Sequence, residues 1–503
     1  MIDNLRNYAF IRERVQKVPY NFAKTKRALP LAEEEGAILV AVENSADLEV
    51  LEELRFLLKA PIRELSVTKE ALDTAIEICF HQTHDATASL IAHLKEESLH
   101  TGIQLEGYDL LDQTAETPVV KLLNLMIAEA IQQGASDIHF EPSYQGLTVR
   151  YRIDGVLQRR HAPPKEIQAP LISRIKVLAR LDIAEQRLPQ DGRIKLSFGG
   201  REIDFRVSTA PVLDGERVVM RILDKSTVTL GLAHLGMPPP LQARLSAIIR
   251  KTEGMILVTG PTGSGKTTTL YSAISDIAVS DLNIMTIEDP VEYKLPHIAQ
   301  MGINPKIGLT FSTGLKHLLR QDPDVMMVGE IRDQETAEIA IQASLTGHLV
   351  LSTLHTNDAP SAITRLVDMG ILPYLLSSSL IAVLAQRLVR ANCPHCLAPY
   401  TPTHQESAYL NLPPNQKFVK GAGCAHCFGV GYRCRLALYE LMELTPTLQE
   451  AMQKTVAASH LRTLALQDGM TPLLASGRAL IQTGLTTPAE VLRVCQGAHH
   501  AAL

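Results

Sequence analysis

Tryptophan is absent from this 503-residue chain, and aromatic residues make up only 4% of it. The hydrophobic content of 46% still provides material for a sizeable core, which must be mainly aliphatic. No run of 18 apolar residues occurs, so no transmembrane helix is expected. The first residues also lack the apolar segment of a signal peptide, which predicts a cytoplasmic location unless a partner holds the chain at a membrane.

A basic excess is missing as well, because the formal net charge is −5. The charge is unevenly distributed, with +5 over residues 1–30 and −10 over residues 32–99. Proteins that bind nucleic acid directly usually carry a basic surplus, so no direct contact with nucleic acid is expected. The simpler interpretation of the acidic stretch is a solvated helical surface.

One sequence motif indicates the class of ligand that the chain binds. It has the pattern G-x-x-x-x-G-K-[ST] of a phosphate-binding loop, between an apolar run over 255–258 and a predicted helix over 267–277. Glycines let the loop backbone turn its N–H groups toward phosphate oxygens, and the helix N-terminus adds a positive dipole end. The lysine would reach the β- and γ-phosphates of ATP, and the last hydroxyl would bind Mg²⁺. The loop consists of Gly260, Pro261, Thr262, Gly263, Ser264, Gly265, Lys266 and Thr267.

Hydrolysis also needs carboxylates, and two apolar runs end in candidates. Glu288 follows the run over 284–287, and Glu330 follows the run over 325–328. We assign Glu330 to the Mg²⁺ shell and Glu288 to polarisation of the attacking water, although the two roles are interchangeable at this point. A helix-capping or exposed carboxylate is the alternative for either residue.

Two histidines bracket a third apolar strand, His348 before it and His355 after it. A single histidine is usually a structural residue. Two of them around one strand downstream of a phosphate-binding loop indicate a sensor of the γ-phosphate.

Four of the seven cysteines form two C-x-x-C pairs with 27 residues between them. In a cytoplasmic protein this spacing predicts a structural zinc site rather than disulfides, since four thiolates complete a tetrahedral shell. The predicted ligands are Cys393, Cys396, Cys424 and Cys427.

Apolar periodicity and turn residues divide the chain into five parts. We expect an α/β docking domain over 1–100, an α+β domain over 101–228, a P-loop ATPase domain over 229–387, a cysteine module over 388–440 and a helical subdomain over 441–503. In the first two parts the pattern predicts strands over 37–42, 137–140, 147–153, 193–198, 202–207 and 217–222. It predicts helices over 47–58, 68–80, 119–132 and 174–181, and a polar linker over 96–116.

These segments together resemble the secretion ATPase superfamily, whose members drive type II secretion and type IV pilus assembly. The phosphate-binding loop, 286–292, 328–333 and 346–358 resemble its Walker A, aspartate box, Walker B and histidine box. Segments of the second part carry the same resemblance, which covers residues 118–445. Those segments are 135–141, 150–155, 188–193 and 204–209.

The resemblance implies a RecA-like P-loop ATPase core, preceded by an α+β, PAS-like domain and assembled as a homohexamer with ATP between subunits. It also implies that the second domain of one subunit directs arginines toward the nucleotide. Arg193 and Arg206 match these motif arginines by position, and Arg221 matches less well. A surplus of arginine suits contact with phosphate, although a basic solvated face is an equal alternative.

The tetracysteine element resembles that of secretion and pilus-assembly ATPases, which pilus-retraction ATPases lack. The resemblance thus implies Zn²⁺ on the four paired cysteines. Cys434 departs from the pattern, because the family usually has glycine there. Two consequences are open: a looser local turn or a fifth thiol.

The N-terminal part favours a type II secretion ATPase. Residues 19–24 resemble the start of the first domain in that family, and pilus-assembly relatives usually carry a longer N-terminal region. The resemblance implies that this domain docks on the cytoplasmic domain of a GspL-like inner-membrane platform protein, with a GspF-like platform protein as a further partner. The chain would then be cytoplasmic and peripheral on the inner membrane.

Two other functions compete with this one. A type IV pilus assembly or DNA-uptake ATPase would use the same core. A non-catalytic, nucleotide-gated scaffold is disfavoured by the intact Lys266, Glu288 and Glu330.

Overall fold

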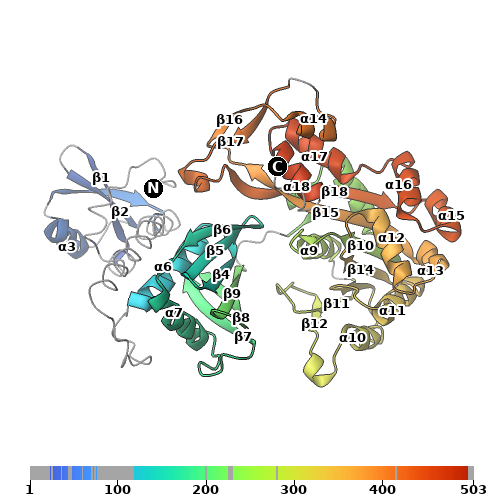
Figure 1. The fold of residues 1–503 in the computed structure, drawn as a ribbon, viewed down its shortest axis with the longest axis horizontal. Coiled ribbons are helices and arrows are strands. Elements are labelled where there is room, and N and C mark those ends of the chain that lie inside the picture. Colours follow the sequence, from blue (N-terminus) through green and yellow to red (C-terminus); the bar gives the residue numbers. More distant parts are fainter. Residues whose placement is uncertain are drawn as a thin grey trace. The chain divides into compact units, whose positions relative to one another are not determined.

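The chain forms two units, Met1–Thr227 and Val228–Leu503, which we describe separately (Figure 1). The computed structural model describes residues 26–34, 37–43, 48–58, 60–68, 118–198, 201–224, 230–278, 281–413 and 416–496, together with Val18, Ala23, Leu72 and Ala75.

A small sheet with the order β1-β2-β3 opens the first unit. The predicted strand and helix over 37–58 are confirmed as β2 (Ala37–Glu43) and α3 (Leu48–Leu58). Two strands escaped prediction, β1 (Ala28–Glu34) and β3 (Ile62–Val67), because both are short and carry charged residues. The helix expected over 68–80 falls almost entirely outside the described residues, and the linker expected over 96–116 falls wholly outside them.

A second, six-stranded antiparallel sheet has the order β6-β5-β4-β9-β8-β7. Alternate residues of its strands pack against α6 and α7, which cover one face (Figure 1). The strands are β4 (Ala135–Ser143), β5 (Gly146–Ile153), β6 (Val156–His161), β7 (Gln190–Phe198), β8 (Arg201–Val212) and β9 (Gly215–Asp224), and the helices are α6 (Pro118–Gln132) and α7 (Lys165–Leu178).

One helix prediction in this sheet domain was wrong at its start. The helix expected over 174–181 begins at Lys165 and ends at Leu178. Pro170 lies inside it, and proline removes a hydrogen bond to the carbonyl four residues earlier. That carbonyl belongs to Glu166, which is exposed in the first turn, so the helix continues through Pro170.

The second unit is built on a seven-stranded sheet with the order β12-β11-β13-β14-β10-β15-β18. All neighbouring strands are parallel except the last pair, β15 and β18. Buried aliphatic side chains fill both faces, with α8 and α9 on one face and α10 to α13 on the other. The strands are β10 (Gly254–Thr259), β11 (Ile284–Glu288), β12 (Ala299–Gly302), β13 (Val325–Val328), β14 (Leu349–Leu354), β15 (Leu380–Asn392) and β18 (Tyr432–Glu443).

Helices connect most of the parallel strands of this unit, as is usual in parallel sheets, although β12 follows β11 without a helix. They are α8 (Pro239–Ile248), α9 (Lys266–Ile277), α10 (Phe311–Leu318), α11 (Gln334–Leu345), α12 (Ala359–Asp368) and α13 (Pro373–Ser379). The cysteine segment is an excursion between the neighbouring strands β15 and β18. It contains β16 (Leu397–Tyr400), α14 (His404–Leu410) and β17 (Phe418–Gly421). Four helices follow, α15 (Pro446–Lys454), α16 (Ala458–Gln467), α17 (Leu473–Gln482) and α18 (Pro488–Gln496).

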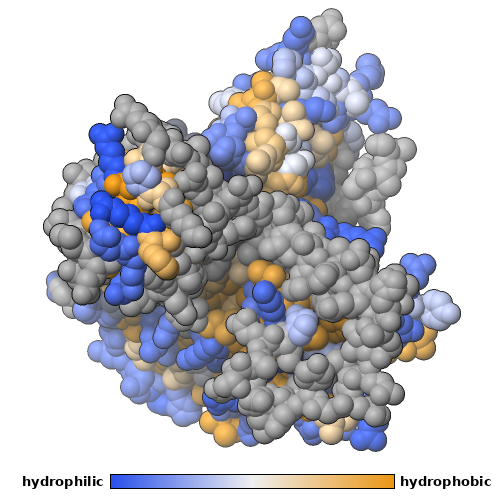
Figure 2. Space-filling model, turned by 90° about the vertical axis from the view of Figure 1, so that its left-hand side faces the viewer, coloured by the Kyte–Doolittle hydropathy of each residue, from blue (hydrophilic) through white to orange (hydrophobic). Residues whose placement is uncertain are grey.

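Among the described residues, no helix has the length and apolar content that crossing a bilayer demands. On the face shown in Figure 2, hydrophilic side chains are interspersed with smaller hydrophobic groups among the residues that are coloured.

Cys434 lies in a bulge of β18, where the pairing with β15 shifts between Arg390 and Asn392. Its backbone φ is +66°, in the left-handed region that favours glycine, and its side chain is exposed. The position thus has the backbone conformation of the glycine that the family usually carries there.

We therefore expect Cys434→Gly to raise the free energy of unfolding by about 0.5–1 kcal/mol, because it relieves the clash of a Cβ atom in this conformation. Chemical denaturation measures the change. Cys434→Ala is the matched control, since it removes the thiol but keeps the Cβ atom. Equal stability of the two variants would show that backbone conformation is not the cause.

Candidate nucleotide-binding and metal sites

The phosphate-binding loop joins the central strand β10 to α9, as predicted. Three of its glycines have positive φ: Gly260 at 151°, Gly263 at 79° and Gly265 at 87°. Lys266 is the first residue of α9. The positive φ values turn the backbone around the N-terminus of this helix, which is the arrangement that binds phosphate.

The loop packs very closely against the adjacent strand β15. A Cβ atom on Gly260 would lie 2.3 Å from the carbonyl oxygen of Gln386, and one on Gly265 would lie 2.8 Å from its Nε2 atom. The side chain of Gln386 also accepts a buried hydrogen bond of 2.6 Å from Thr269 in α9. Glycine is required at both loop positions because β15 leaves no room for a side chain.

Lys266 is folded back onto its own loop. Its Nζ atom donates to the carbonyl oxygens of Gly260 at 2.8 Å and Pro261 at 3.1 Å. Burial lowers the pKa of Lys266 to about 8, against the opposing effect of the Glu330 carboxylate. Ser264 is 3% exposed and its hydroxyl has no hydrogen-bond partner among the described residues. A buried lysine and an unpaired hydroxyl within a glycine cradle fit a phosphate ligand.

The strand order brings the other predicted residues to the same edge of the sheet. Glu288, Glu330, His355 and the phosphate-binding loop follow the carboxyl ends of β11, β13, β14 and β10, which are consecutive neighbours. Open parallel sheets bind ligands at this edge.

Glu288 is buried and its two carboxylate oxygens are both occupied. Tyr271 donates to Oε2, while Thr286 and Gln300 donate to Oε1 at 2.5 and 3.1 Å. Burial, followed by the hydrogen bond to Glu288, raises the pKa of Tyr271 far above its ordinary value, so this phenol remains a donor. Glu288 is thus rigidly held.

Glu330 is more accessible than Glu288 and is paired with a guanidinium group and an imidazole ring. Arg332 donates to its Oε1 atom, and the Nε2 atom of His355 lies 3.2 Å from Oε2. Both partners are partly exposed. The structure therefore brings together Glu330 and His355 at the edge of the sheet that carries the phosphate-binding loop.

The second histidine is not part of this group. His348 precedes β14, at the opposite edge of the sheet, and its Nδ1 atom lies 2.9 Å from the carbonyl oxygen of Ala343. Asp324 also lies at that edge and accepts a hydrogen bond of 2.7 Å from the backbone of Asn283. Of the two histidines around this strand, only His355 therefore lies at the edge of the phosphate-binding loop, because a six-residue strand separates its ends.

Arg193 and Arg206 belong to the first unit and face each other across β7 and β8. The row continues through Arg221 on β9 to Asp137 on β4, on the face turned away from α6 and α7. Asp137 accepts a hydrogen bond of 2.9 Å from Arg221 and lies 3.6 Å from Arg152. The row thus carries four arginines and a single carboxylate.

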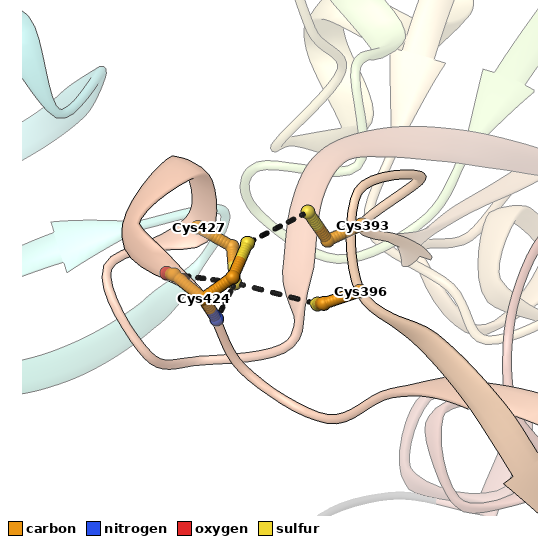
Figure 3. Close-up of side chains that lie close together, drawn as sticks. All are labelled: Cys393, Cys396, Cys424 and Cys427. Atoms are coloured by element: carbon orange, nitrogen blue, oxygen red, sulfur yellow. Dashed lines mark hydrogen bonds between the residues drawn. The ribbon is translucent and has the colours of Figure 1, made fainter.

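The four paired cysteines converge, and their sulfur atoms all lie within 4.8 Å of one another (Figure 3). Three of the Sγ–Sγ distances are 3.7–3.8 Å. Four thiolates around one zinc ion, at bond lengths of about 2.3 Å, are separated by about 3.8 Å, so the cluster fits a tetrahedral metal site. Cys434 lies outside this group, so it is not a fifth thiol of the cluster.

Backbone N–H groups point at the sulfur atoms of the cluster. Gly423 donates to Cys396 at 3.3 Å, and both Cys424 and Gly431 donate to Cys427 at 3.2 Å. Burial acts to raise the pKa of Cys427, but these hydrogen bonds outweigh it and lower the pKa to about 7. A lowered pKa favours the thiolate form in which cysteine binds a metal, whereas burial raises the pKa of Cys393 and Cys396.

Three residues of the nucleotide site escaped prediction. Tyr271 and Arg332 hold the two glutamates. Arg332 lies in the segment 328–333 that resembles Walker B, but the sequence assigned it no role, and no motif distinguishes Tyr271 from an ordinary helix residue. Gln386 had a detectable signal, because it is a polar residue near the middle of the apolar run of β15 and is only 3% exposed.

Comparison with known proteins identifies the family. A family model described as type II/IV secretion system protein matches residues 112–493, and the MshEN domain matches residues 4–86. The chain belongs to the type II/IV secretion ATPase family. The resemblance stated from the sequence is confirmed.

This secretion ATPase is 45% identical over 490 residues to type II secretion system protein E of Pseudomonas aeruginosa, with 95% of this chain and 96% of that protein covered. It is 41% identical over 499 residues to type II secretion system ATPase E of Vibrio cholerae, with coverages of 96% and 97%. The type IV pilus assembly ATPase PilB of Myxococcus xanthus is also 41% identical, over 97% of this chain and 88% of PilB. These relatives make the chain a type II secretion ATPase, with the pilus-assembly branch as the alternative.

Solved structures confirm the RecA-like fold class. The ATPase DotB of Legionella pneumophila matches with a TM-score of 0.56 at 21% identity, over 76% of this chain and 96% of DotB. The pilus retraction motor PilT with bound ADP matches with a TM-score of 0.51 at 27% identity, over 76% of this chain and 98% of PilT. Family and fold together make the chain an ATP-hydrolysing enzyme.

The lowered pKa of Lys266 predicts proton uptake on nucleotide binding. Below about pH 8 the free enzyme already holds an ammonium ion; above it the amine is increasingly neutral and must gain a proton to meet a phosphate. We expect ATP to bind more weakly as the pH rises through about 8, with uptake of part of a proton near about pH 9.

Calorimetry in two buffers with different ionisation enthalpies measures this uptake. Lys266→Arg is the control, because a guanidinium remains charged throughout the range. Equal proton uptake by both proteins would assign the effect to another group.

Proposed function

We propose that this secretion ATPase works as a homohexamer in which ATP hydrolysis between subunits powers type II secretion. One observation carries the proposal: the phosphate-binding loop, both glutamates and His355 meet at one edge of a parallel sheet. That edge contains the parts that phosphoryl transfer to water requires, namely a phosphate cradle, carboxylates and a polar group near the γ-phosphate.

Within the site, Lys266 binds the β- and γ-phosphates and Thr267 holds Mg²⁺, which neutralises the charge that develops on the phosphate oxygens. Glu330 supports the Mg²⁺ shell, and Glu288 polarises the attacking water. The accessibility of Glu330 favours its place beside the ion. The donors on Glu288 hold its carboxylate in one orientation, which suits a group that positions water. His355, next to Glu330, reports the γ-phosphate.

Arg193 and Arg206 complete the site from a neighbouring subunit. They lie opposite each other on β7 and β8, on the face of the sheet turned away from α6 and α7. An arginine offered across a subunit boundary stabilises transferring phosphate and makes turnover depend on assembly.

The metal of the cysteine module is zinc in this proposal. The sulfur spacing and the N–H groups directed at the sulfurs support a closed, four-thiolate structural site on the excursion between β15 and β18. Its function is to hold that excursion in one conformation.

The N-terminal domain docks on the cytoplasmic domain of a GspL-like inner-membrane platform protein, and the ring acts on a GspF-like platform protein. The chain is thereby cytoplasmic and peripheral on the inner membrane. The match of residues 4–86 to the MshEN domain supports a separate N-terminal module, as docking requires. A pull-down with the full-length protein distinguishes the alternatives, since capture of pilus platform proteins would favour pilus assembly.

The catalytic assignment predicts that Lys266→Ala and Glu330→Gln each abolish ATP turnover, while Lys306→Ala, which removes an exposed lysine, leaves it unchanged. Arg206→Ala should also be inactive alone. Co-assembly of Lys266→Ala and Arg206→Ala subunits should restore activity at about a quarter of the interfaces. In a randomly mixed heterologous ring, about one interface in four joins a subunit with intact Lys266 to a neighbour with intact Arg206.

Steady-state ATPase assays on the single variants and on co-expressed mixtures check this. Substantial turnover by Lys266→Ala would contradict the assignment of the site. Inactive mixtures with intact rings would place the arginine and the lysine in the same subunit's site.

The zinc proposal predicts about one zinc ion per chain by elemental analysis. Cys427→Ser should lower the zinc content and the melting temperature, because it removes a ligand that two backbone N–H groups support. Cys434→Ser, outside the cluster, should retain the metal. A protein that is fully folded and free of zinc would refute a structural zinc site.

A further inference from the structure

The loop after β14 carries His355 and is tied to the phosphate-binding strand. Thr356 Oγ1 lies 2.7 Å from the hydroxyl of Thr259, the last residue of β10, and the Thr356 amide donates to that hydroxyl at 2.9 Å. These bonds hold one end of the loop beside the nucleotide site. The position of His355 therefore also depends on what holds the other end.

The other end of the loop is held by residues that follow it far along the chain. Arg387 on β15 donates to the carbonyl oxygen of Asn357 at 3.1 Å and to its Oδ1 atom at 2.9 Å. Asp358 precedes α12, and its Oδ1 atom accepts from the amide of Ser361 in the first turn of that helix. Its Oδ2 atom accepts from Arg462 on α16. One carboxylate thus links the catalytic loop to the C-terminal helices.

A second carboxylate joins the same two regions. Glu440 on β18 is 4% exposed, and its Oε1 atom accepts from the amide of Ala359, the first residue of α12, at 2.8 Å. Its Oε2 atom accepts from the amide of Leu473, the first residue of α17, at 3.3 Å. A carboxylate at two helix N-termini satisfies amides that have no partner within their helices.

We propose that Arg462 is a positioning residue for hydrolysis: through Asp358 it holds the loop that carries His355 against Glu330. The inference rests on the proposed roles of His355 and Glu330. Helices α15 to α18 contain none of the site residues. Through Arg462, their arrangement sets the position of His355 and thereby the rate of hydrolysis.

A purely structural role for Arg462 makes a different prediction. The Arg462 side chain is 47% exposed and that of Asp358 is 20% exposed. Ion pairs at such exposure contribute little to the stability of the fold, because solvent screens them. A large loss of turnover on removal of Arg462, without loss of stability, must therefore arise from the position of the loop.

A double-mutant cycle between Arg462→Ala and His355→Ala tests the proposal in the full-length protein. We expect Arg462→Ala to lower kcat about tenfold, with the KM for ATP and the melting temperature nearly unchanged. In the His355→Ala background the same substitution should cause no further loss, because the residue that it positions is gone. Arg462→Lys should recover part of the activity, since it keeps a cation near Asp358.

Lys454→Ala is the matched control, because it removes an ion pair with Glu450 on the neighbouring helix α15. It should leave kcat unchanged. If His355→Ala is impaired and Arg462→Ala lowers kcat by the same factor in that background as in the wild type, the positioning role is overturned. The proposed function would remain intact. Full activity of His355→Ala itself would overturn the role of His355 and, with it, that of Arg462.

Discussion

The close approach of the phosphate-binding loop to β15 is the constraint on which the ATPase unit depends. Two glycines leave just enough room for the Gln386 backbone and side chain, and the Gln386 amide also holds α9 through Thr269. Because Gln386 fills this side of the loop, a phosphate cannot bind there. The glycine pattern therefore restricts where phosphate can bind as well as allowing it to bind.

The two glutamates at that edge lie in contrasting environments. Glu288 is buried and receives hydrogen bonds from a tyrosine, a threonine and a glutamine, whereas Glu330 is partly exposed beside Arg332 and His355. A carboxylate whose two oxygens are both held by donors is suited to orienting a water molecule. A more exposed carboxylate is suited to exchange of ligands. This contrast supports different roles for two residues that look equivalent in the sequence.

The sheet also explains how distant segments reach the site. After β15 the chain leaves for the cysteine segment and returns as the antiparallel edge strand β18. The excursion with the four cysteines is thus inserted without disturbing the parallel strands. Glu440 on β18 and Arg462 on α16 reach back to the start of α12. The C-terminal part of the chain is consequently bonded to the loop that follows β14 at the nucleotide site.

The sequence alone determined the local chemistry: the glycine spacing, the acids after apolar runs and the two C-x-x-C pairs each require short-range geometry that a motif specifies. Tertiary structure decided which of these residues meet. His355 lies beside Glu330, whereas His348 lies at the opposite edge of the sheet. Both positions follow from strand order and direction, which depend on packing across the whole sheet. Tertiary structure also revealed Gln386, Tyr271 and Arg462, whose contacts join residues 17 to 117 positions apart, a separation that no local pattern can encode.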